Sequence, residues 1–340
     1  MTCDSESSRL RVGRRREVLA EARALVSRGA GSAAQRRLLE VALDGLAPVV
    51  EQDGPLLFME VPLAVHAAAG GGSAPAVRLA AVCSLVFLGA DVLDDLADGD
   101  LRPGWEAFSP GELTLGAATL LSALAPLAVA ELGLPPVTTA ALHRTLALGL
   151  LRMAAGQHED LRSTAFPVEV TPDSIEAAVA GKSGEEFAMF CSLAAQAAGA
   201  SPEVASHYAA MGKAIGTGGQ IASDCFELLE DPAARDLRRG ALTLPLALHL
   251  ERLAGEQRTA FRELLERARK EETARESVRR EIRAGGALRM TVFAVETHRQ
   301  RALRELAAAN PVGEGRAALH NLIDELSFFG GFSSQSEEVG

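Results

Sequence analysis

Apolar side chains recur along this chain at helical spacing, in successive segments that end at short runs rich in Gly and Pro. The clearest of these runs are GAGS at 29–32, GGGSAP at 70–75, GLPP at 133–136 and GASPE at 199–203. Runs that alternate apolar and polar residues, which are typical of strands, are nearly absent. Ala and Leu, two strong helix formers, dominate the composition. We therefore predict an all-α fold, a single-domain bundle of roughly ten or more helices around a central cavity.

The order of the segments gives no sign of a second domain, since the chain has no internal repeat and no long linker. We predict one domain over residues 16–330, with disordered tails at 1–15 and 331–340. Arginines cluster between Arg9 and Arg16, and no apolar run of a signal peptide follows them. The first interpretation of this basic segment is a mobile tail. The alternative is a cap over an anionic ligand.

A run of acidic residues follows the most apolar part of the pattern. Residues 80–90, AAVCSLVFLGA, read as a buried helix, and directly after them come Asp91, Asp94, Asp95 and Asp98. Because a helix turns about 100° per residue, these four carboxylates form one stripe. Buried like charges repel, and all-oxygen ligands suit Mg²⁺. We therefore predict that Asp94, Asp95 and Asp98 are catalytic metal ligands; the alternative is a solvated helix end.

A second acidic group lies further along, in the segment GGQIASDCFELLEDPAARDLRRG. Ser223, Glu227 and Asp231 recur every four residues and so share one side of a helix, with Asp224 beside them. Taken alone, this group is equally consistent with an acidic surface. Two facing helices of this kind can hold several Mg²⁺ ions, of which we expect three, together with a diphosphate. We therefore predict that all four residues are metal ligands.

Side chains that could bind a diphosphate occur near the acidic segments. Lys182 precedes an apolar helix and is one of only three lysines, and Arg238 and Arg239 follow the second acidic group. A guanidinium binds phosphate oxygens in pairs, whereas a lysine acts as a point charge. We predict that these three residues and Gln220 bind diphosphate. A solvated loop is the alternative for the two arginines.

Charge and cysteine usage exclude some classes of function. The net charge of −11 argues against a nucleic-acid partner. The four cysteines have no CxxC spacing, and we interpret them as small core residues of a cytoplasmic protein. The apolar stretch 113–130 is broken by Pro126, so we predict a core helix there and no transmembrane segment.

Five segments taken together resemble motifs of the trans-isoprenyl diphosphate synthases, the polyprenyl synthetase superfamily, and of the class I terpene cyclases that share their fold. The family motifs are DDxxD, GQxxDL, KT, a second aspartate-rich motif and DLxxGKxTLP. The corresponding segments here are Asp94–Asp98, Gly156–Leu161, Lys182-Ser183, Gln220–Glu227 and Asp236–Pro245. The resemblance covers residues 76–325. It implies an isoprenoid synthase fold, a prenyl diphosphate substrate, Mg²⁺ and a homodimer.

Two departures from the family pattern bear on the reaction. Chain-elongating synthases also bind isopentenyl diphosphate on a GGKxxRP segment, but no Lys or Arg occurs here between Arg37 and Arg78, and Ala241 replaces the lysine of DLxxGKxTLP. A site for one allylic diphosphate remains. We therefore predict a class I terpene cyclase, in which ionisation of that diphosphate is followed by attack of the substrate's own double bonds. The alternatives are a prenyltransferase, acting on isopentenyl diphosphate or another acceptor, and a non-catalytic partner subunit.

The hydrocarbon of such a substrate needs an apolar pocket beside the motifs. Aromatic faces stabilise carbocations without reacting with them, although plain core packing explains these residues equally well. Small residues just before the first motif, Gly89 and Ala90, leave room for a long chain and favour geranylgeranyl over farnesyl diphosphate. The residues predicted to line the pocket are Phe87, Gly89, Ala90, Gln157, Phe187, Phe190 and Phe226.

Overall fold

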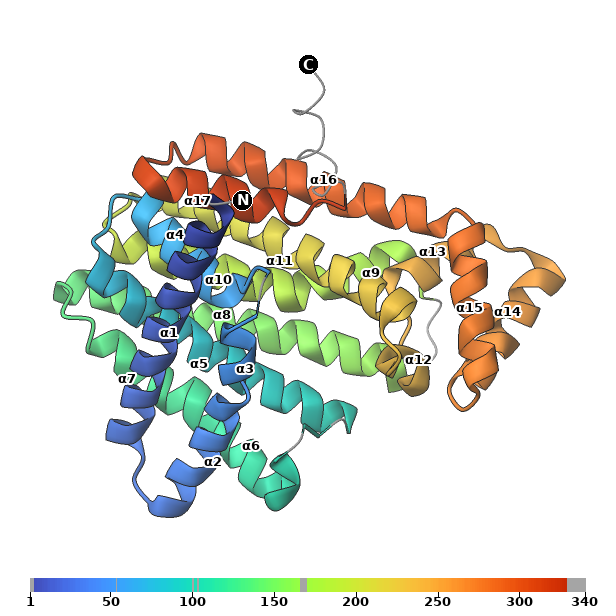
Figure 1. Ribbon diagram of the computed structural model, residues 1–340, viewed down its shortest axis with the longest axis horizontal. Coiled ribbons are helices and arrows are strands. Elements are labelled where there is room, and N and C mark those ends of the chain that lie inside the picture. Colours follow the sequence, from blue (N-terminus) through green and yellow to red (C-terminus); the bar gives the residue numbers. More distant parts are fainter. Residues whose placement is uncertain (1–2, 53, 100, 103, 166–169, 329–340) are drawn as a thin grey trace. The chain divides into compact units, whose positions relative to one another are not determined.

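Every regular element of the chain is a helix in the ranges that the computed structural model describes (Figure 1). These ranges are residues 3–52, 54–99, 101–102, 104–165 and 170–328. The all-α prediction is therefore confirmed. The predicted C-terminal tail, 331–340, lies outside the described residues.

The described residues group into two compact units, and the single domain over 16–330 stays a prediction. The first unit comprises the described residues within 3–150, 189–209 and 306–322, and the second comprises those within 151–188, 210–305 and 323–328. Helices rather than linkers carry the chain across each boundary, so no change of composition marks the division. These helices are α8 (Pro136–Ala165), α10 (Glu185–Ala197), α11 (Pro202–Glu230), α16 (Ala287–Ala308) and α17 (Gly313–Asp324).

The first unit is built around α5, the apolar helix that carries the aspartate stripe. This helix packs against α1, α4, α6 and α7, and its stretch from Leu79 to Val92 is largely buried. Gly99 ends α5 in the left-handed conformation, and its N–H donates to the carbonyl of Asp95. The elements that lie wholly in this unit are α1 (Cys3–Gly29), α2 (Ala33–Asp44), α3 (Ala47–Val50), α4 (Leu57–Ala68), α5 (Ser73–Asp98), η1 (Trp105–Ala107), α6 (Pro110–Thr119), η2 (Leu120–Leu124) and α7 (Ala125–Ala130).

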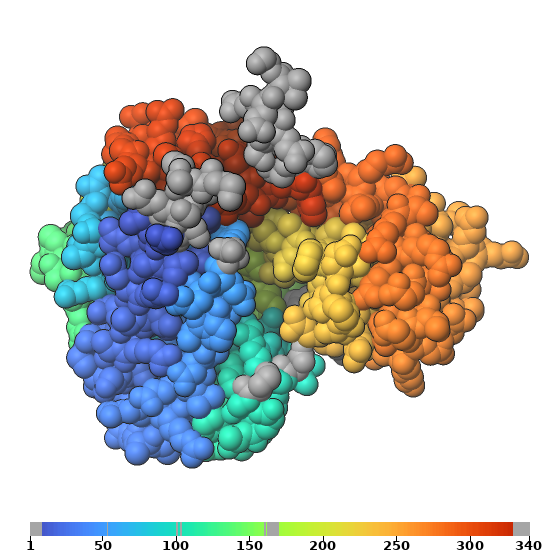
Figure 2. Space-filling view, viewed as in Figure 1, coloured from blue at the N-terminus to red at the C-terminus, as the bar shows by residue number. Residues whose placement is uncertain are grey.

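The N-terminal segment differs from the disordered tail predicted over 1–15. Helix α1 begins at Cys3, and its part from residue 9 onward contributes to the surface of the first unit (Figure 2). Arg15 is buried and donates from Nε to Glu60 Oε1 at 2.7 Å, while Arg11 binds both oxygens of the same carboxylate at 2.7 and 3.0 Å. Arg15 also donates to the carbonyls of Gln52 and Gly54. These contacts order α1, and they occupy two arginines that the alternative interpretation assigns to an anionic ligand.

Gly89 does not leave open space beside α5. A Cβ at this position would lie 2.8 Å from Leu121 Cγ and 3.1 Å from Leu120 Cβ, and both leucines belong to the π-helical turn η2. The missing side chain therefore lets η2 pack directly on α5. The inference of a longer substrate from a small residue at 89 is not supported within this unit.

The core of the second unit lies among α13, α14, α15 and the C-terminal part of α11. Ile221 and Leu228 of α11 are buried in one cluster with Leu248, Phe261 and Val278. Helices α14 and α15 pack side by side (Figure 1). The elements that lie wholly in this unit are α9 (Pro172–Val179), η3 (Ala180–Gly184), α12 (Arg235–Arg239), α13 (Leu244–Arg252), α14 (Gly255–Ala268) and α15 (Glu272–Ala284).

Two helical stretches, Ser73–Asp98 and Pro110–Ala130, are long and apolar enough to cross a membrane by length and composition. Their most apolar windows are 67% and 44% buried inside the protein. The first window is mostly buried, as in the core helix of a globular protein, whereas less than half of the second is buried, so the core helix predicted over 113–130 stays a prediction. Three of the four cysteines are also buried, as predicted for core residues: Cys83, Cys191 and Cys225.

Candidate active site

The aspartate stripe lies at the C-terminal end of α5, in the first unit. Arg102 Nη2 lies 2.6 Å from Asp91 Oδ1, and Arg102 Nε lies 2.8 Å from Asp95 Oδ2. Asp94 is partly buried and Asp98 is exposed. One guanidinium therefore bridges two carboxylates of the stripe, which the sequence did not predict.

Four carboxylates at this end of α5 are electrostatically unfavourable unless cations are bound nearby. The last carbonyls of a helix carry partial negative charge. Burial raises the pKa of Asp95 to about 6; the Arg102 guanidinium opposes that shift, and Asp91 and Asp94 add to it. A divalent cation with oxygen ligands would relieve this repulsion. The donor chemistry of the stripe therefore fits the predicted Mg²⁺.

The second acidic cluster lies on α11 and α12, in the second unit. Asp224 and Glu227 are both partly buried, and the backbone N–H of Asp236 donates to Glu227 Oε1 at 2.8 Å. Burial raises the pKa of Asp224 to about 7, and the Asp236 carboxylate adds to the shift. Burial also raises the pKa of Glu227. These three carboxylates therefore act on one another, and Asp236 is the member that the predicted site residues leave out.

A chain of hydrogen bonds joins this cluster to the segment around Lys182. Ser183 Oγ donates to Gln220 Oε1 at 3.1 Å, and Gln220 Nε2 donates to Asp224 Oδ1 at 2.7 Å. The ammonium of Lys182 favours the charged form of Asp224 and so lowers its pKa. The structure therefore brings Lys182, Gln220, Asp224 and Glu227 together within one unit, and the sequence predicts a role for each of them.

Glycines set the position of the Lys182 segment, which forms the π-helical turn η3. A Cβ at Gly156 of α8 would lie 2.3 Å from the carbonyl oxygen of Gly181. A Cβ at Gly216 of α11 would lie 2.3 Å from the carbonyl oxygen of Ser183. Both helices therefore approach the backbone of η3 directly, at distances that only glycine permits. Isolated π-turns of this kind are frequent at functional sites.

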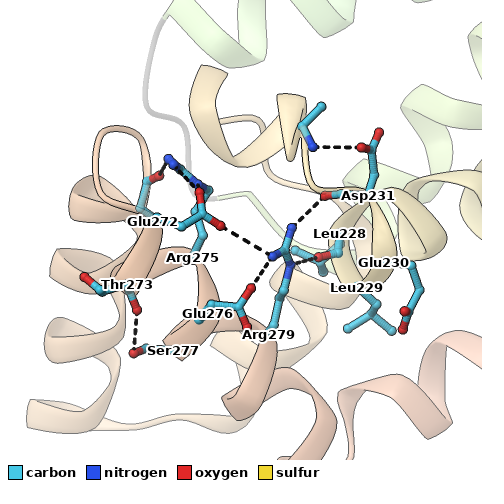
Figure 3. Close-up of polar contacts among 12 residues, drawn as sticks. Leu228, Leu229, Glu230, Asp231, Glu272, Thr273, Arg275, Glu276, Ser277 and Arg279 are labelled. Carbon is cyan, nitrogen blue, oxygen red and sulfur yellow. Dashed lines mark hydrogen bonds and ion pairs between the residues drawn. The ribbon is translucent and has the colours of Figure 1, made fainter.

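Arginines of α15 hold the last turn of α11, just beyond the second cluster (Figure 3). Arg279 is buried and donates to the carbonyls of Leu228 at 2.9 Å and Asp231 at 2.7 Å. Arg283 donates to the carbonyl of Leu229 at 2.8 Å. Because the final carbonyls of a helix have no partner within it, these side chains complete the end of α11. Sequence spacing gives no signal for this role, since Arg279 and Leu228 are 51 residues apart.

Other predicted ligands have different surroundings. Asp231 Oδ1 accepts a hydrogen bond from the backbone N–H of Ala233 at 2.8 Å, so this carboxylate shapes the turn after α11. Arg239 Nη2 lies 2.6 Å from Asp236 Oδ1. Two further predicted residues are exposed: Ser223 and Arg238. Within the second unit, Asp224 and Glu227 act on each other through their charges. Arg235 Nη2 lies 3.6 Å from Glu227 Oε2 and 3.9 Å from Asp231 Oδ2, so this guanidinium lies near both carboxylates, whereas Ser223 is exposed.

The predicted pocket residues do not share one environment. Phe87 stacks on Phe58 in the first unit, with ring centroids 4.1 Å apart. Phe187 and Phe190 are buried, the latter completely. Phe226 is 65% exposed, so packing within its unit does not place it in a hydrocarbon pocket. Ala90 and Gln157 are partly buried, and Gly89 packs against η2.

A comparison with models of protein families identifies the family of this chain. The family model of polyprenyl synthetases matches residues 60–282, a range that contains all five motif segments. The chain belongs to the polyprenyl synthetase family. Among proteins with curated descriptions, none matches the sequence significantly.

Solved structures of polyprenyl synthetases share the fold. Geranylgeranyl pyrophosphate synthetase from Pyrococcus horikoshii is 19% identical with a TM-score of 0.81, and the match covers 96% of this chain and 99% of that one. A polyprenyl synthetase from Streptomyces coelicolor is 21% identical with a TM-score of 0.80, covering 92% and 97%. Geranylgeranyl pyrophosphate synthase from Corynebacterium glutamicum, complexed with isoprenyl diphosphate and magnesium, is 19% identical with a TM-score of 0.75, covering 94% and 98%. At these identities the likeness shows the fold alone.

The carboxylates of this polyprenyl synthetase fit a metal that is bound together with a substrate. In the described part of the chain, no three His, Cys, Asp or Glu side chains converge closely enough to hold a metal ion by themselves. Mg²⁺ is commonly held by one or two carboxylates with phosphate oxygens and water as its other ligands. The raised pKa values of Asp95 and Asp224 are consistent with such a site, because bound cations would offset the repulsion.

Gly156→Ala is expected to displace the Lys182 segment of this polyprenyl synthetase. The new methyl group overlaps the Gly181 carbonyl, so the backbone must move, at a cost of about 1–3 kcal/mol in the free energy of unfolding. Misplacing a substrate-binding group by about 1 Å lowers a rate roughly 10- to 100-fold. Thermal unfolding and Mg²⁺-dependent diphosphate release measure the two effects.

Gly13→Ala is the matched control for this substitution. Gly13 lies in α1, and no atom lies within 4 Å of the position of its added Cβ. Alanine there is expected to leave activity unchanged and to stabilise the helix by up to about 1 kcal/mol. Equal activity of the two variants would show that close packing at Gly156 does not position η3.

Proposed function

We propose that the chain is a Mg²⁺-dependent prenyltransferase, which ionises an allylic prenyl diphosphate and transfers the prenyl group to an acceptor. The observation that carries this proposal is the family match over residues 60–282, which includes the hydrogen-bonded group of Ser183, Gln220 and Asp224 beside Lys182. Asp224 and Glu227 interact electrostatically, and both take ligand positions of the second aspartate-rich motif of the synthases, together with Ser223. The metal triad of class I cyclases, N-D-x-x-S-x-x-x-E, would place its ligands at Ser223, Glu227 and Asp231, so Ser223 and Glu227 do not distinguish the two functions. Because of the family match, the prenyltransferase, an alternative at the level of sequence, becomes the leading proposal.

One observation keeps the class I terpene cyclase as a second candidate. Where elongating synthases have GGKxxRP, this chain has no Lys or Arg between Arg37 and Arg78. Arginines of α1 reach this segment, but each of them is paired with one of its carboxylates: Arg11 and Arg15 bind Glu60, Arg16 binds Glu51, and Arg23 binds Asp44. A second diphosphate therefore lacks the usual cationic patch. An uncharged acceptor, or the substrate's own double bonds, would not need one.

The roles proposed for the side chains follow from their charges and contacts. Bound Mg²⁺ would stabilise the charge of the departing diphosphate. Asp94, Asp95 and Asp98 hold this metal in the first unit, and Asp224 and Glu227 supply oxygens in the second. Contacts to the departing diphosphate accelerate the reaction only if they are stronger in the transition state, where negative charge builds up on the leaving group, than in the bound substrate.

The groups around the second cluster orient the ligands. Lys182 offers a point charge to diphosphate oxygens. The side-chain amide of Gln220 donates a hydrogen bond to Asp224 and accepts one from the hydroxyl of Ser183. That both clusters bind the same diphosphate remains a prediction, and so do three Mg²⁺ ions, a homodimer and a cytoplasmic location.

The deciding experiment is incubation with geranylgeranyl or farnesyl diphosphate and Mg²⁺, with and without isopentenyl diphosphate. Hexane extraction and mass analysis identify the products. A longer diphosphate that forms only with both substrates supports the leading proposal. A hydrocarbon from the allylic substrate alone supports the cyclase. No consumption of any allylic diphosphate would overturn both and favour a non-catalytic partner subunit.

Stability is expected to depend on pH through Asp224. Folding raises the pKa of this carboxyl to about 7, from about 4 in an unfolded chain. The stability that Asp224 contributes is therefore fully present when the pH is below the pKa of the unfolded chain. It is lost as the pH rises through the pKa of the folded protein. Protons and Mg²⁺ compete for the same carboxylate.

We therefore expect Mg²⁺ to raise the unfolding temperature more near pH 8 than near pH 6, which follows from proton competition. In EDTA, wild-type protein should lose more stability between these pH values than Asp224→Asn does. Thermal unfolding of both proteins, with Mg²⁺ or with EDTA and near pH 6 or near pH 8, measures both effects. A larger effect of Mg²⁺ at the lower pH, or equal pH dependence of the two proteins, would contradict the expectation.

A further inference from the structure

A cavity of ≈ 400 Å³ lies in the second unit, among residues of α9, α13 and α16. Its apolar lining consists of Pro172, Leu244, Leu248, Met290, Phe293 and Ala294. Phe293 is 74% exposed although it lines the cavity, so its ring stands at the open side. The volume lies in the range of small-molecule sites, about 300–1,000 Å³. None of the residues proposed to bind metal or diphosphate lines this cavity.

Two cationic side chains of the lining converge on one point. Arg289 Nη2 and Arg252 Nη2 lie 3.4 and 3.6 Å from the position that a Cβ would take at Gly286. Within the described residues neither arginine has an ion pair, and Arg252 Nη1 lies 3.8 Å from Met290 Sδ. Both arginines are exposed, so water screens much of their mutual repulsion, and an anion between them would interact favourably with both. Gly286 has a φ of +81°, which favours glycine, and its lack of a side chain leaves the space between the two groups open.

The acidic residues of the lining do not neutralise this pair. Glu176 Oε1 lies 3.1 Å from His298 Nε2. Asp173 lies in the first turn of α9, where the N-terminal end of the helix stabilises a carboxylate. The arginines therefore remain available to an anion from outside the chain.

We propose that this cavity binds an amphiphilic organic phosphate, with its phosphate or diphosphate head between Arg252 and Arg289 and its apolar chain along Leu248 and Phe293. Guanidinium groups bind phosphate oxygens through paired, charge-assisted hydrogen bonds. The apolar lining would remove the chain of the ligand from water. This proposal does not rest on the proposed function, since it needs neither Mg²⁺ nor the motif residues.

Isothermal titration calorimetry in EDTA, with geranyl diphosphate as the probe, tests the proposal without contribution from Mg²⁺. Arg252→Gln and Arg289→Gln are each expected to weaken binding about tenfold or more, since each removes charge-assisted hydrogen bonds. Phe293→Ala is expected to weaken geranyl diphosphate binding but to leave inorganic diphosphate binding unchanged. Arg301→Gln is the matched control, because Arg301 is an exposed arginine of the same helix α16. Its affinity for the probe should equal that of the wild type.

Three outcomes would overturn the proposal. Equal affinity of wild type and Arg252→Gln or Arg289→Gln would show that the arginines do not bind the head. Inorganic diphosphate binding as tightly as geranyl diphosphate would show a site for a bare anion. Geraniol binding as tightly as the probe would show an apolar site without anion recognition.

Discussion

Asp94→Ala is expected to reduce Mg²⁺-dependent turnover of an allylic diphosphate by more than about 100-fold, since loss of even an outer-shell partner of a metal costs 10- to 100-fold. Asp94 belongs to the stripe at the end of α5. In the proposed function it holds metal directly, so its removal leaves the leaving group without part of its charge stabilisation. Diphosphate release from geranylgeranyl and farnesyl diphosphate over a range of Mg²⁺ concentrations measures the loss.

The stability of this variant separates a lost ligand from a damaged fold. Removing one carboxylate relieves repulsion with Asp91 and Asp95, so in EDTA the unfolding temperature should stay unchanged or rise. Asp44→Ala is the control, since Asp44 is an exposed aspartate at the end of another helix, α2. It should retain activity. Near-normal turnover in Asp94→Ala would rule out the metal role of the stripe.

Arg279→Met is expected to lower the free energy of unfolding by about 3 kcal/mol, the cost of breaking a buried charged network. The substitution removes the donors to the carbonyls of Leu228 and Asp231 and leaves Glu276 without its closest partner. The unfolding temperature should fall by roughly 6 °C or more. Activity should fall as well, because the last turn of α11 follows Glu227 directly.

The neighbouring arginine provides the control for this change. Arg280 lies next in sequence on α15 and is exposed, so Arg280→Met makes the same change of charge without removing these contacts. Thermal unfolding and hydrogen exchange at residues 227–231 compare the two variants. If both unfold at the same temperature, the buried guanidinium does not stabilise the end of α11.

Local patterns in the sequence predicted the parts of the site that depend on neighbours along one helix. The apolar run before Asp91 indicated a buried helix, and α5 is that helix. Helical spacing also grouped Ser223, Glu227 and Asp231 on one face of α11; in the structure Arg235 lies near Glu227 and Asp231, whereas Ser223 is exposed. Helix geometry relates positions three or four residues apart, but it does not show which of them other helices bury or pair.

Contacts between distant segments could not be predicted in this way. The arginines near the N-terminus resemble a solvated tail until Glu60 is placed beside them, 45 residues from Arg15. Gly89 resembles an opening for substrate until η2 is seen to fill it. The role of Arg279 depends on a partner in another helix. In each case the missing information is which side chain the fold brings into contact with the residue. That partner lies far away in the sequence, so no local pattern of a single sequence identifies it.

The link from α1 to Glu60 has a practical consequence for anyone who shortens this protein for expression. Because the sequence predicts a disordered tail over 1–15, it gives no reason to expect that a chain starting at residue 16 is destabilised. Such a chain would nevertheless lack both Arg11 and Arg15. Glu60, only 7% exposed, would then be an ionised acid in an apolar interior, and such groups instead take up a proton or force the fold open. Trimming this end should therefore yield protein that precipitates or melts early, whereas full-length material should not.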